Sequence, residues 1–388
     1  MASTGIDIAE LLDLLDAGER LWVLDVRNDD DFAAWQLEAK RPIETVHIPY
    51  FEWLEDQGGA LDRLPRDRDV IVVCARGESS AIVAEMLRDA GVRASNLEGG
   101  MLAYSRHVQP ARVSFPADGC GGIELWQLNR RARGCLSYVV RLGGDAIVVD
   151  PSRDVASYER FVLGIGARIA LVLDTHVHAD HVSGGPLLAA RSGAPYFVDM
   201  ADGCPDAEQV DLSELCRRSE PAQVFRILEV LRTPGHTPGS RSYLVADRYL
   251  LSGDTLTVRG IGRPDLDSQV VERGHEFFHT LHERFRPLGD GTVVLPAHSS
   301  GVPEMGPDDV VSCLLGELRC RPEFQIDSED AFVASFLEAV TVDLDPPPAA
   351  YAEIVRANRD ARVVDEEQAA IWEVGKNQCS AHAARLLS

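Results

Sequence analysis

Short apolar runs alternate with helical patterns along the first hundred residues. Apolar residues recur at helical spacing from Ile6 to Ala17, where Gly18 ends the pattern, and a short apolar run follows at 21–27. A second apolar run spans 69–74, and after a polar loop a helical pattern covers about 80–90. Strands that alternate with helices in this way are typical of a small parallel α/β domain.

The pattern changes beyond residue 122. Apolar runs at 136–141 and 146–150 flank the turn Gly143-Gly144-Asp145, which favours a β-hairpin. A helical pattern over 155–163 and a buried strand over 169–173 follow. The chain therefore contains a second α/β domain with its own sheet, in line with the two domains that 388 residues usually form.

In this second domain, four apolar runs each end in a polar group that can bind a metal. The ends of strands in an α/β sheet hold side chains on rigid backbone, and such ends usually carry the site. Imidazoles and carboxylates suit zinc or ferrous iron. The alternative is a set of loops whose histidines only form hydrogen bonds, which the clustering disfavours. The groups are His176, His178, Asp180 and His181 after the first run, then His236, Asp254 and His298.

Cys74 lies where the strand at 69–74 ends and a helix is about to begin. Backbone N–H groups of such a loop favour an anion, and therefore a nucleophilic thiolate. The alternative is a buried, inert thiol, as is common for the other scattered cysteines. A cysteine phosphatase would need Arg six positions later to bind phosphate. That position is Ser80, so phosphatase chemistry is disfavoured.

Charge and composition exclude several classes of function. The net charge of −24 disfavours binding to nucleic acid or to anionic membranes, because both need basic patches. No apolar run approaches the ~18 residues of a membrane span. The first residues lack the basic and apolar regions of a secretory signal, so we expect a cytoplasmic protein. The cysteines form no C-x-x-C pair, which indicates neither a zinc ribbon nor a disulfide framework.

The first domain, residues 1–108, resembles the rhodanese family. The resemblance implies that Cys74 accepts a sulfane sulfur as a persulfide cradled by backbone amides. It also implies that Arg76 binds an anionic donor such as thiosulfate. The matching segments are Asp25-Val26-Arg27, His47-Ile48-Pro49, the loop Cys74–Ser80 and Leu97-Glu98-Gly99-Gly100-Met101.

Residues 123–358 resemble the metallo-β-lactamase fold, an αββα sandwich with its metal site at the sheet edge. In that fold His176, His178 and His236 match the first metal position. Asp180, His181 and His298 match the second, and Asp254 can bridge the two. The resemblance implies a metal centre but does not decide the reaction.

Two segments are similar to the persulfide dioxygenase branch of this fold: 252–265 and 346–359. This implies one Fe(II) per chain, held by His176, His236 and Asp254, that oxidises a glutathione-like persulfide with O₂ to sulfite. His178, Asp180, His181 and His298 would then surround the centre without binding the iron. Arg259 or Arg263 would hold the carboxylates of the thiol.

Two other functions stay open. One is a thiolesterase similar to hydroxyacylglutathione hydrolase, with two zinc ions that activate a hydroxide. The other is a non-enzymatic sulfur carrier with a degenerate metal domain, which the intact ligand set disfavours.

The connecting and terminal segments carry less information. Residues 109–122 contain two prolines and several glycines, so we expect a linker. The tail, 359–388, predicts a helix over about 366–387 with Ile371, Trp372 and Val374 near one another. We expect this apolar stripe to pack on the sandwich, and the alternative is a homodimer.

Overall fold

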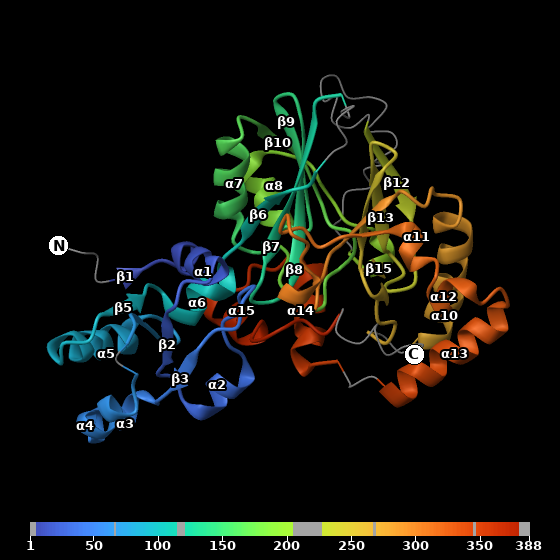
Figure 1. Ribbon diagram of the computed structural model, residues 1–388. Helices are drawn as coiled ribbons and strands as arrows, with labels where there is room; N and C mark the ends of the chain where they lie inside the picture. Colours follow the sequence, from blue (N-terminus) through green and yellow to red (C-terminus); the bar gives the residue numbers. More distant parts are fainter. Residues whose placement is uncertain are drawn as a thin grey trace.

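The computed structural model describes residues 5–65, 67–114, 121–204, 227–266, 269–343 and 347–379. Its first domain is a five-stranded, fully parallel sheet (Figure 1) in the order β1-β5-β4-β2-β3. The strands are β1 (Gly5–Ile6), β2 (Trp22–Asp25), β3 (Thr45–His47), β4 (Val70–Val73) and β5 (Ala94–Leu97). The helices are α1 (Ile8–Ala17), α2 (Asp29–Ala34), α3 (Tyr50–Glu55), α4 (Gln57–Asp62), α5 (Glu78–Asp89) and α6 (Gly100–Arg106).

The predicted parallel α/β domain is thus confirmed. One core lies between the sheet and α1 and α6, and a second lies on the other face under α3, α4 and α5. Local sequence explains where α1 begins and ends. The Asp7 side chain accepts a hydrogen bond from the backbone N–H of Glu10, and Gly18 ends the helix at φ 83°, which glycine adopts easily.

The second domain contains two large sheets. The first has the order β11-β10-β9-β8-β7-β6 and the second the order β12-β13-β14-β17-β18, with β15 and β16 as a separate pair. The strands of the first are β6 (Gln109–Arg112), β7 (Ile123–Arg130), β8 (Cys135–Leu142), β9 (Asp145–Val149), β10 (Arg168–Leu173) and β11 (Tyr196–Phe197). The others are β12 (Leu228–Arg232), β13 (Arg241–Val245), β14 (Tyr249–Gly253), β15 (Leu256–Thr257), β16 (Gly260–Ile261), β17 (Val293–Pro296) and β18 (Cys313–Leu314).

Helices cover the outer faces of both sheets, which gives the predicted αββα sandwich (Figure 1). On the first sheet lie α7 (Val155–Gly164) and α8 (Gly185–Ser192). On the second lie α10 (Val270–His279), η3 (Thr280–Phe285), α11 (Leu315–Leu318), α12 (Pro322–Gln325) and α13 (Glu329–Asp343). The short helices η1 (Met200–Asp202) and η4 (Val302–Glu304) lie in loops. In the ranges that the structure describes, no helix combines the length and apolar character needed to cross a bilayer.

The central core lies between the two sheets. Leu125, Val140 and Leu171 of the first sheet are fully buried in the same cluster as Leu251 and Leu295 of the second. This packing places the ends of β10, β14 and β17 at one common edge, because these strands run through the core in register with their neighbours. The edge is where the candidate ligands lie.

The segment predicted to be a linker begins as a strand. Residues 109–112 form β6, which pairs antiparallel with β7 at the edge of the first sheet. Proline is tolerated at such an edge, where its missing N–H faces away from the partner strand, and Pro110 lies opposite Leu128. Only residues 107 and 108 separate α6 from β6, so the two domains are closely joined. Residues 115–120 lie outside the described part of the chain.

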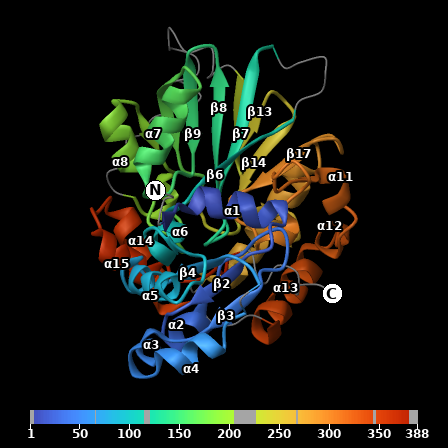
Figure 2. The ribbon, with the colours of Figure 1, turned by 60° about the vertical axis from the view of Figure 1, so that its left-hand side comes forward.

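The tail differs from its prediction. In the structure the tail starts at Ala349 and not at residue 359: it contains α14 (Ala349–Arg359) and α15 (Glu366–Trp372), and the helix predicted to reach residue 387 ends at Trp372. The chain turns there because Glu373 enters a buried ion network, and Gly375 then adopts φ 74°. Figure 2 shows α14 and α15 between α8 of the sandwich and α5 of the first domain. Residues 380–388 lie outside the described ranges.

A buried tyrosine joins the two sheets and offers a test of the sandwich. The hydroxyl of Tyr138 on β8 donates to the carbonyl of Pro296 on β17 at 2.6 Å. Tyr138→Phe leaves that buried acceptor without a partner, so we expect the free energy of unfolding to fall by ~1–3 kcal/mol. The midpoint of urea unfolding measures it. Leu163→Ala on α7, where the side chain is exposed, is the control and should change stability by no more than ~0.5 kcal/mol.

Candidate metal centre and cysteine site

The loop after β10 meets three other strand ends at one edge of the sandwich. His176, His178, Asp180 and His181 lie in this loop, and His236 lies between β12 and β13. Asp254 directly follows β14, and His298 follows β17. All seven side chains are at most 1% exposed. The structure therefore brings together every metal-binding residue that the sequence predicted, in a site closed to solvent.

His176, His236 and Asp254 form one compact cluster. The Nε2 atoms of His176 and His236 lie 3.6 and 3.4 Å from Oδ2 of Asp254. The other ring nitrogens are held from behind, because His236 Nδ1 lies 2.7 Å from the Arg263 carbonyl and His176 Nδ1 lies 2.9 Å from Thr175 Oγ1. Both Nε2 atoms therefore point toward the carboxylate.

Burial sets the charge of these groups. It holds the pKa of His176 well below its usual value, with a contribution from the nearby imidazole of His178, and it also lowers the pKa of His236. Burial alone would raise the pKa of Asp254, but the contact with His298 outweighs it and keeps that pKa low. The cluster thus presents neutral imidazoles and a carboxylate, which are the forms that bind a metal ion.

Asp180, His181 and His298 form a second cluster, and Cys135 completes it. His298 Nε2 lies 3.0 Å from Asp180 Oδ2, and His181 Nδ1 lies 3.0 Å from Asp180 Oδ1. The Cys135 thiol lies 3.3 Å from Asp180 Oδ2. On its other ring nitrogen, His298 contacts Asp254 at 2.6 Å, which connects the second cluster to the first.

His178 lies between the two clusters, with its ring centroid 4.3 Å from that of His176 and 4.4 Å from that of His181, but its nitrogen contacts a different carboxylate. Its Nε2 is 3.1 Å from Oδ1 of Asp150, and these two residues group with Asp174. Asp174, which directly follows β10, accepts hydrogen bonds from Ser183 and Tyr196. Asp150 is the partner that sequence reasoning missed. Its signal was its position at the end of β9, and the structure gives it a φ of 52°, which is unusual for a residue other than glycine.

The residues fit a metal ion. Four of the five site histidines have one buried ring nitrogen that, among the residues that the structure describes, has no hydrogen-bond partner: Nε2 of His176, His181 and His236, and Nδ1 of His178. Buried polar atoms in native proteins almost always have a partner, and an ion is one explanation for an exception. Nitrogen and carboxylate ligands suit zinc and iron alike.

Cys74 lies in a cradle at the end of β4. Its Sγ accepts hydrogen bonds from the backbone N–H of Gly77 at 3.1 Å and from the hydroxyl of Ser80 at 3.0 Å, where α5 begins. Glycine is required at position 100, since a Cβ there, at φ 55°, would overlap the Cys74 carbonyl. The arrangement stabilises negative charge on the sulfur. Ser80, which served only to disfavour a phosphatase, is a donor to the thiol.

Family comparisons agree with this geometry. The model of the metallo-beta-lactamase superfamily matches residues 130–298, and the model of the rhodanese-like domain matches residues 7–107. The chain belongs to the metallo-β-lactamase superfamily. It carries a rhodanese-like domain before the metallo-β-lactamase domain, which confirms the predicted fusion.

Relatives of named activity align with only part of this chain. It is 28% identical over 157 residues to the mitochondrial persulfide dioxygenase ETHE1 of Bos taurus, which is 40% of this chain and 59% of that relative. It is 30% identical over 181 residues to the hydroxyacylglutathione hydrolase of Anaeromyxobacter dehalogenans, which is 47% of this chain and 68% of that protein. The crystal structure of a metallo-β-lactamase from Staphylococcus aureus superimposes with a TM-score of 0.52 at 25% identity, over 63% of this chain and 74% of the other.

The predicted substrate-binding arginines are engaged elsewhere. Arg259 pairs with Glu304, and Arg263 pairs with Asp265 at 2.7 Å. Arg263 is fully buried, and its backbone carbonyl contacts His236. Arg263 therefore contacts the metal centre through its backbone carbonyl, while its guanidinium binds Asp265.

Arg76 of the Cys74 loop contacts the tail. Its guanidinium donates to Glu367 on α15 at 3.1 Å. A cavity of about 210 Å³ lies between this loop and the tail, and its lining includes Arg27, Trp35, Arg76, Ile371 and Val374. The apolar stripe of the tail thus faces the rhodanese-like domain in part. The homodimer stays a prediction.

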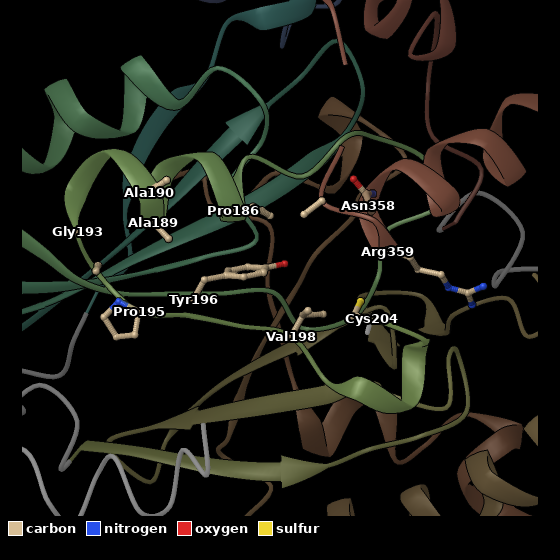
Figure 3. Close-up of a pocket in the computed structure, with 12 residues that line it drawn as sticks. Pro186, Ala189, Ala190, Gly193, Pro195, Tyr196, Val198, Cys204, Asn358 and Arg359 are labelled. Atoms are coloured by element: carbon tan, nitrogen blue, oxygen red, sulfur yellow. The ribbon is translucent and has the colours of Figure 1, made fainter. Parts of the chain in front are cut away.

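A larger cavity lies on the other side of the metal loop. It has a volume of about 450 Å³ and lies between α8, β11 and the end of α14 (Figure 3). Tyr196, Cys204 and Arg359 line it, and its described lining contains none of the candidate ligands. Asn358, at its edge in Figure 3, is the residue that connects it to the metal loop.

Gly262 offers a test of the metal centre that leaves every ligand in place. A Cβ at this position would overlap the carbonyl of Asp254 and lie 3.1 Å from Nδ1 of His236. Gly262→Ala should therefore displace two ligands and weaken metal binding by at least ~10-fold, the lower range for loss of supporting contacts. Titration with a metal-binding competitor dye measures this. Gly289→Ala, where nothing lies within 4 Å, is the matched control and should bind metal normally.

Proposed function

We propose that this protein oxidises a low-molecular-weight, glutathione-like persulfide with O₂ to sulfite at one Fe(II), and transfers sulfane sulfur at Cys74. The overall reaction is RSSH + O₂ + H₂O → RSH + H₂SO₃, in which the terminal sulfur is oxidised and O₂ is reduced. The thiol leaves with a proton, and the acid ionises to sulfite in water.

The observation that carries this proposal is the compact group that His176, His236 and Asp254 form. His178 does not belong to this group, because its Nε2 contacts Asp150. Two imidazoles and one carboxylate are the ligands of mononuclear iron centres that leave positions open. The similarity to persulfide dioxygenase ETHE1 and the fusion to a rhodanese-like domain support the same reading.

Each residue has a defined part in this reaction. Iron, when bound, supplies the redox chemistry that zinc lacks. His176, His236 and Asp254 would hold it, and His298 orients Asp254 through its hydrogen bond. The buried site excludes bulk water, which protects a reactive persulfide. Arg259 and Arg263 stay predicted contacts for the carboxylates of the thiol, and need to leave their present partners to make them.

Cys74 exchanges sulfur with small molecules in the first domain. A thiosulfate donor, S₂O₃²⁻, transfers its outer sulfur to the thiolate and leaves as sulfite. The Cys74 persulfide then passes that sulfur to a thiol, which regenerates Cys74 and forms RSSH, the substrate of the second domain. The donors from Gly77 and Ser80 stabilise the anionic sulfur at each stage.

The second candidate is a thiolesterase with two zinc ions, similar to hydroxyacylglutathione hydrolase. The cluster of Asp180, His181 and His298 favours it, because these residues match a second metal position and Nε2 of His181 has no partner within the described structure. The identity to the Anaeromyxobacter hydrolase favours it as well. The two candidates differ in metal content and in the need for O₂.

Metal analysis combined with an oxygen electrode distinguishes them. We expect one iron per chain, O₂ uptake with glutathione persulfide, and sulfite as product. His236→Ala should lower O₂ uptake by more than ~100-fold, since a direct ligand contributes more than the supporting contacts whose loss costs ~10–100-fold. His279→Ala, an exposed histidine on α10, is the control. Two zinc ions per chain with hydrolysis of acylated glutathione would instead establish the thiolesterase.

Mutation should separate the activities of the two domains. Cys74→Ser should abolish sulfur transfer from thiosulfate to a thiol, because the hydroxyl cannot form a persulfide, and should leave O₂ uptake with added glutathione persulfide intact. Cys320→Ser changes an exposed cysteine and should affect neither activity. Loss of O₂ uptake in Cys74→Ser with preformed persulfide would contradict two independent sites.

A further inference from the structure

The metal loop is held by a side chain from the tail. Asn358, on α14, donates through Nδ2 to the carbonyls of His178 at 2.8 Å and His181 at 2.9 Å. Its Oδ1 accepts from the backbone N–H of Ser183 at 2.9 Å. These backbone groups lie outside any strand or helix, so Asn358 supplies partners that secondary structure does not. The amide thus spans the loop on either side of His181.

A second tail residue holds the same loop. Glu373 accepts the backbone N–H of Val182 through Oε1 at 2.9 Å. Its Oε2 contacts Arg130 at 2.5 Å and Arg153 at 3.2 Å. Burial would raise the pKa of Glu373, but these two guanidinium groups outweigh it and lower that pKa to about 2. The residue, only 3% exposed, is therefore a charged anchor.

The same anchor reaches the rhodanese-like domain. Arg130, which binds Glu373, also donates through Nε to the carbonyl of Ser105 on α6 at 2.5 Å. On the surface, Glu366 of α15 pairs with Arg106 of that helix at 2.5 Å. Figure 2 shows α15 beside α6 at this junction. The carboxylate of Glu373 thus contacts the metal loop directly, through Val182. It reaches the rhodanese-like domain indirectly, through Arg130.

We propose that Asn358 and Glu373 are positioning residues for the metal centre. They fix the backbone of the 178–183 loop, and the contacts of Asp180 with His298 and of His298 with Asp254 carry that position to a proposed ligand. Both positioning residues lie outside residues 130–298, the part matched by the superfamily model. Side chains that orient metal ligands from behind typically contribute ~10–100-fold to metal affinity. The inference rests on the metal-binding part of the proposed function and is independent of its reaction with O₂.

Cobalt(II) binding to the full-length protein tests this inference, because the visible absorption of bound Co²⁺ reports coordination geometry. Glu373→Gln keeps the size of the side chain but removes the charge between two buried arginines. Asn358→Asp removes both donors to the loop carbonyls. We expect each variant to raise the Kd for Co²⁺ by ~10-fold or more and to alter the absorption bands. Loss of a buried charge can prevent folding. If Glu373→Gln does not fold, the result for Asn358→Asp alone decides the test.

Glu366→Gln is the matched control. Glu366 lies on α15 and contacts Arg153, as Glu373 does, but its side chain is 60% exposed. Because exposed ion pairs contribute little, Glu366→Gln should change the Kd for Co²⁺ by less than ~fivefold. A folded variant at either position with a wild-type Kd and spectrum, whatever its unfolding midpoint, would refute the proposal. Wild-type protein that binds no Co²⁺ would instead refute the metal centre itself, so the two failures are distinguishable.

Discussion

The structure must satisfy the polar groups of a buried site. Five imidazoles and several carboxylates share this site, which solvent does not reach. Within the described chain, one nitrogen of His176, His178, His181 and His236 has no hydrogen-bond partner, and each such group costs ~1–3 kcal/mol when it is buried. A metal cation would offset this cost, because it can accept the lone pairs of several ring nitrogens at the same time. Strand ends, the close approach of Gly262 and the hydrogen bonds behind each ring all serve to keep these groups together.

Much of this arrangement was accessible from the sequence, because it follows from local patterns. His176, Asp254 and His298 each come directly after an apolar strand, and strands of one sandwich that run in the same direction bring their ends to one edge. What the sequence could not show are contacts between distant segments. Glu373 and Val182 are 191 residues apart, and Asn358 and His178 are 180 apart. No periodicity marks such pairs.

The errors have the same origin. The tail pattern predicted a helix to residue 387, since apolar spacing alone does not show that Glu373 is withdrawn into an ion network. Residues 109–112 have the composition of a linker, yet β7 offers a free edge that accepts a strand with proline. At Ser80 the sequence disfavoured one function but did not show what the residue does. A guanidinium there would suit the oxygens of phosphate, whereas the Ser80 hydroxyl donates to the Cys74 sulfur, a contact that the sequence alone did not show.

The junction between the domains bears on how sulfur travels. Buried ion pairs such as Arg130–Glu373 contribute little net stability, because desolvation offsets their attraction, but they fix geometry. With β6 starting two residues after α6 ends, the rhodanese-like domain has little freedom to turn. Cys74 is itself buried and held by two hydrogen bonds. These hydrogen bonds hold the sulfur within the first domain. In the proposed function, sulfur would therefore reach the metal centre on a diffusible carrier such as a low-molecular-weight persulfide.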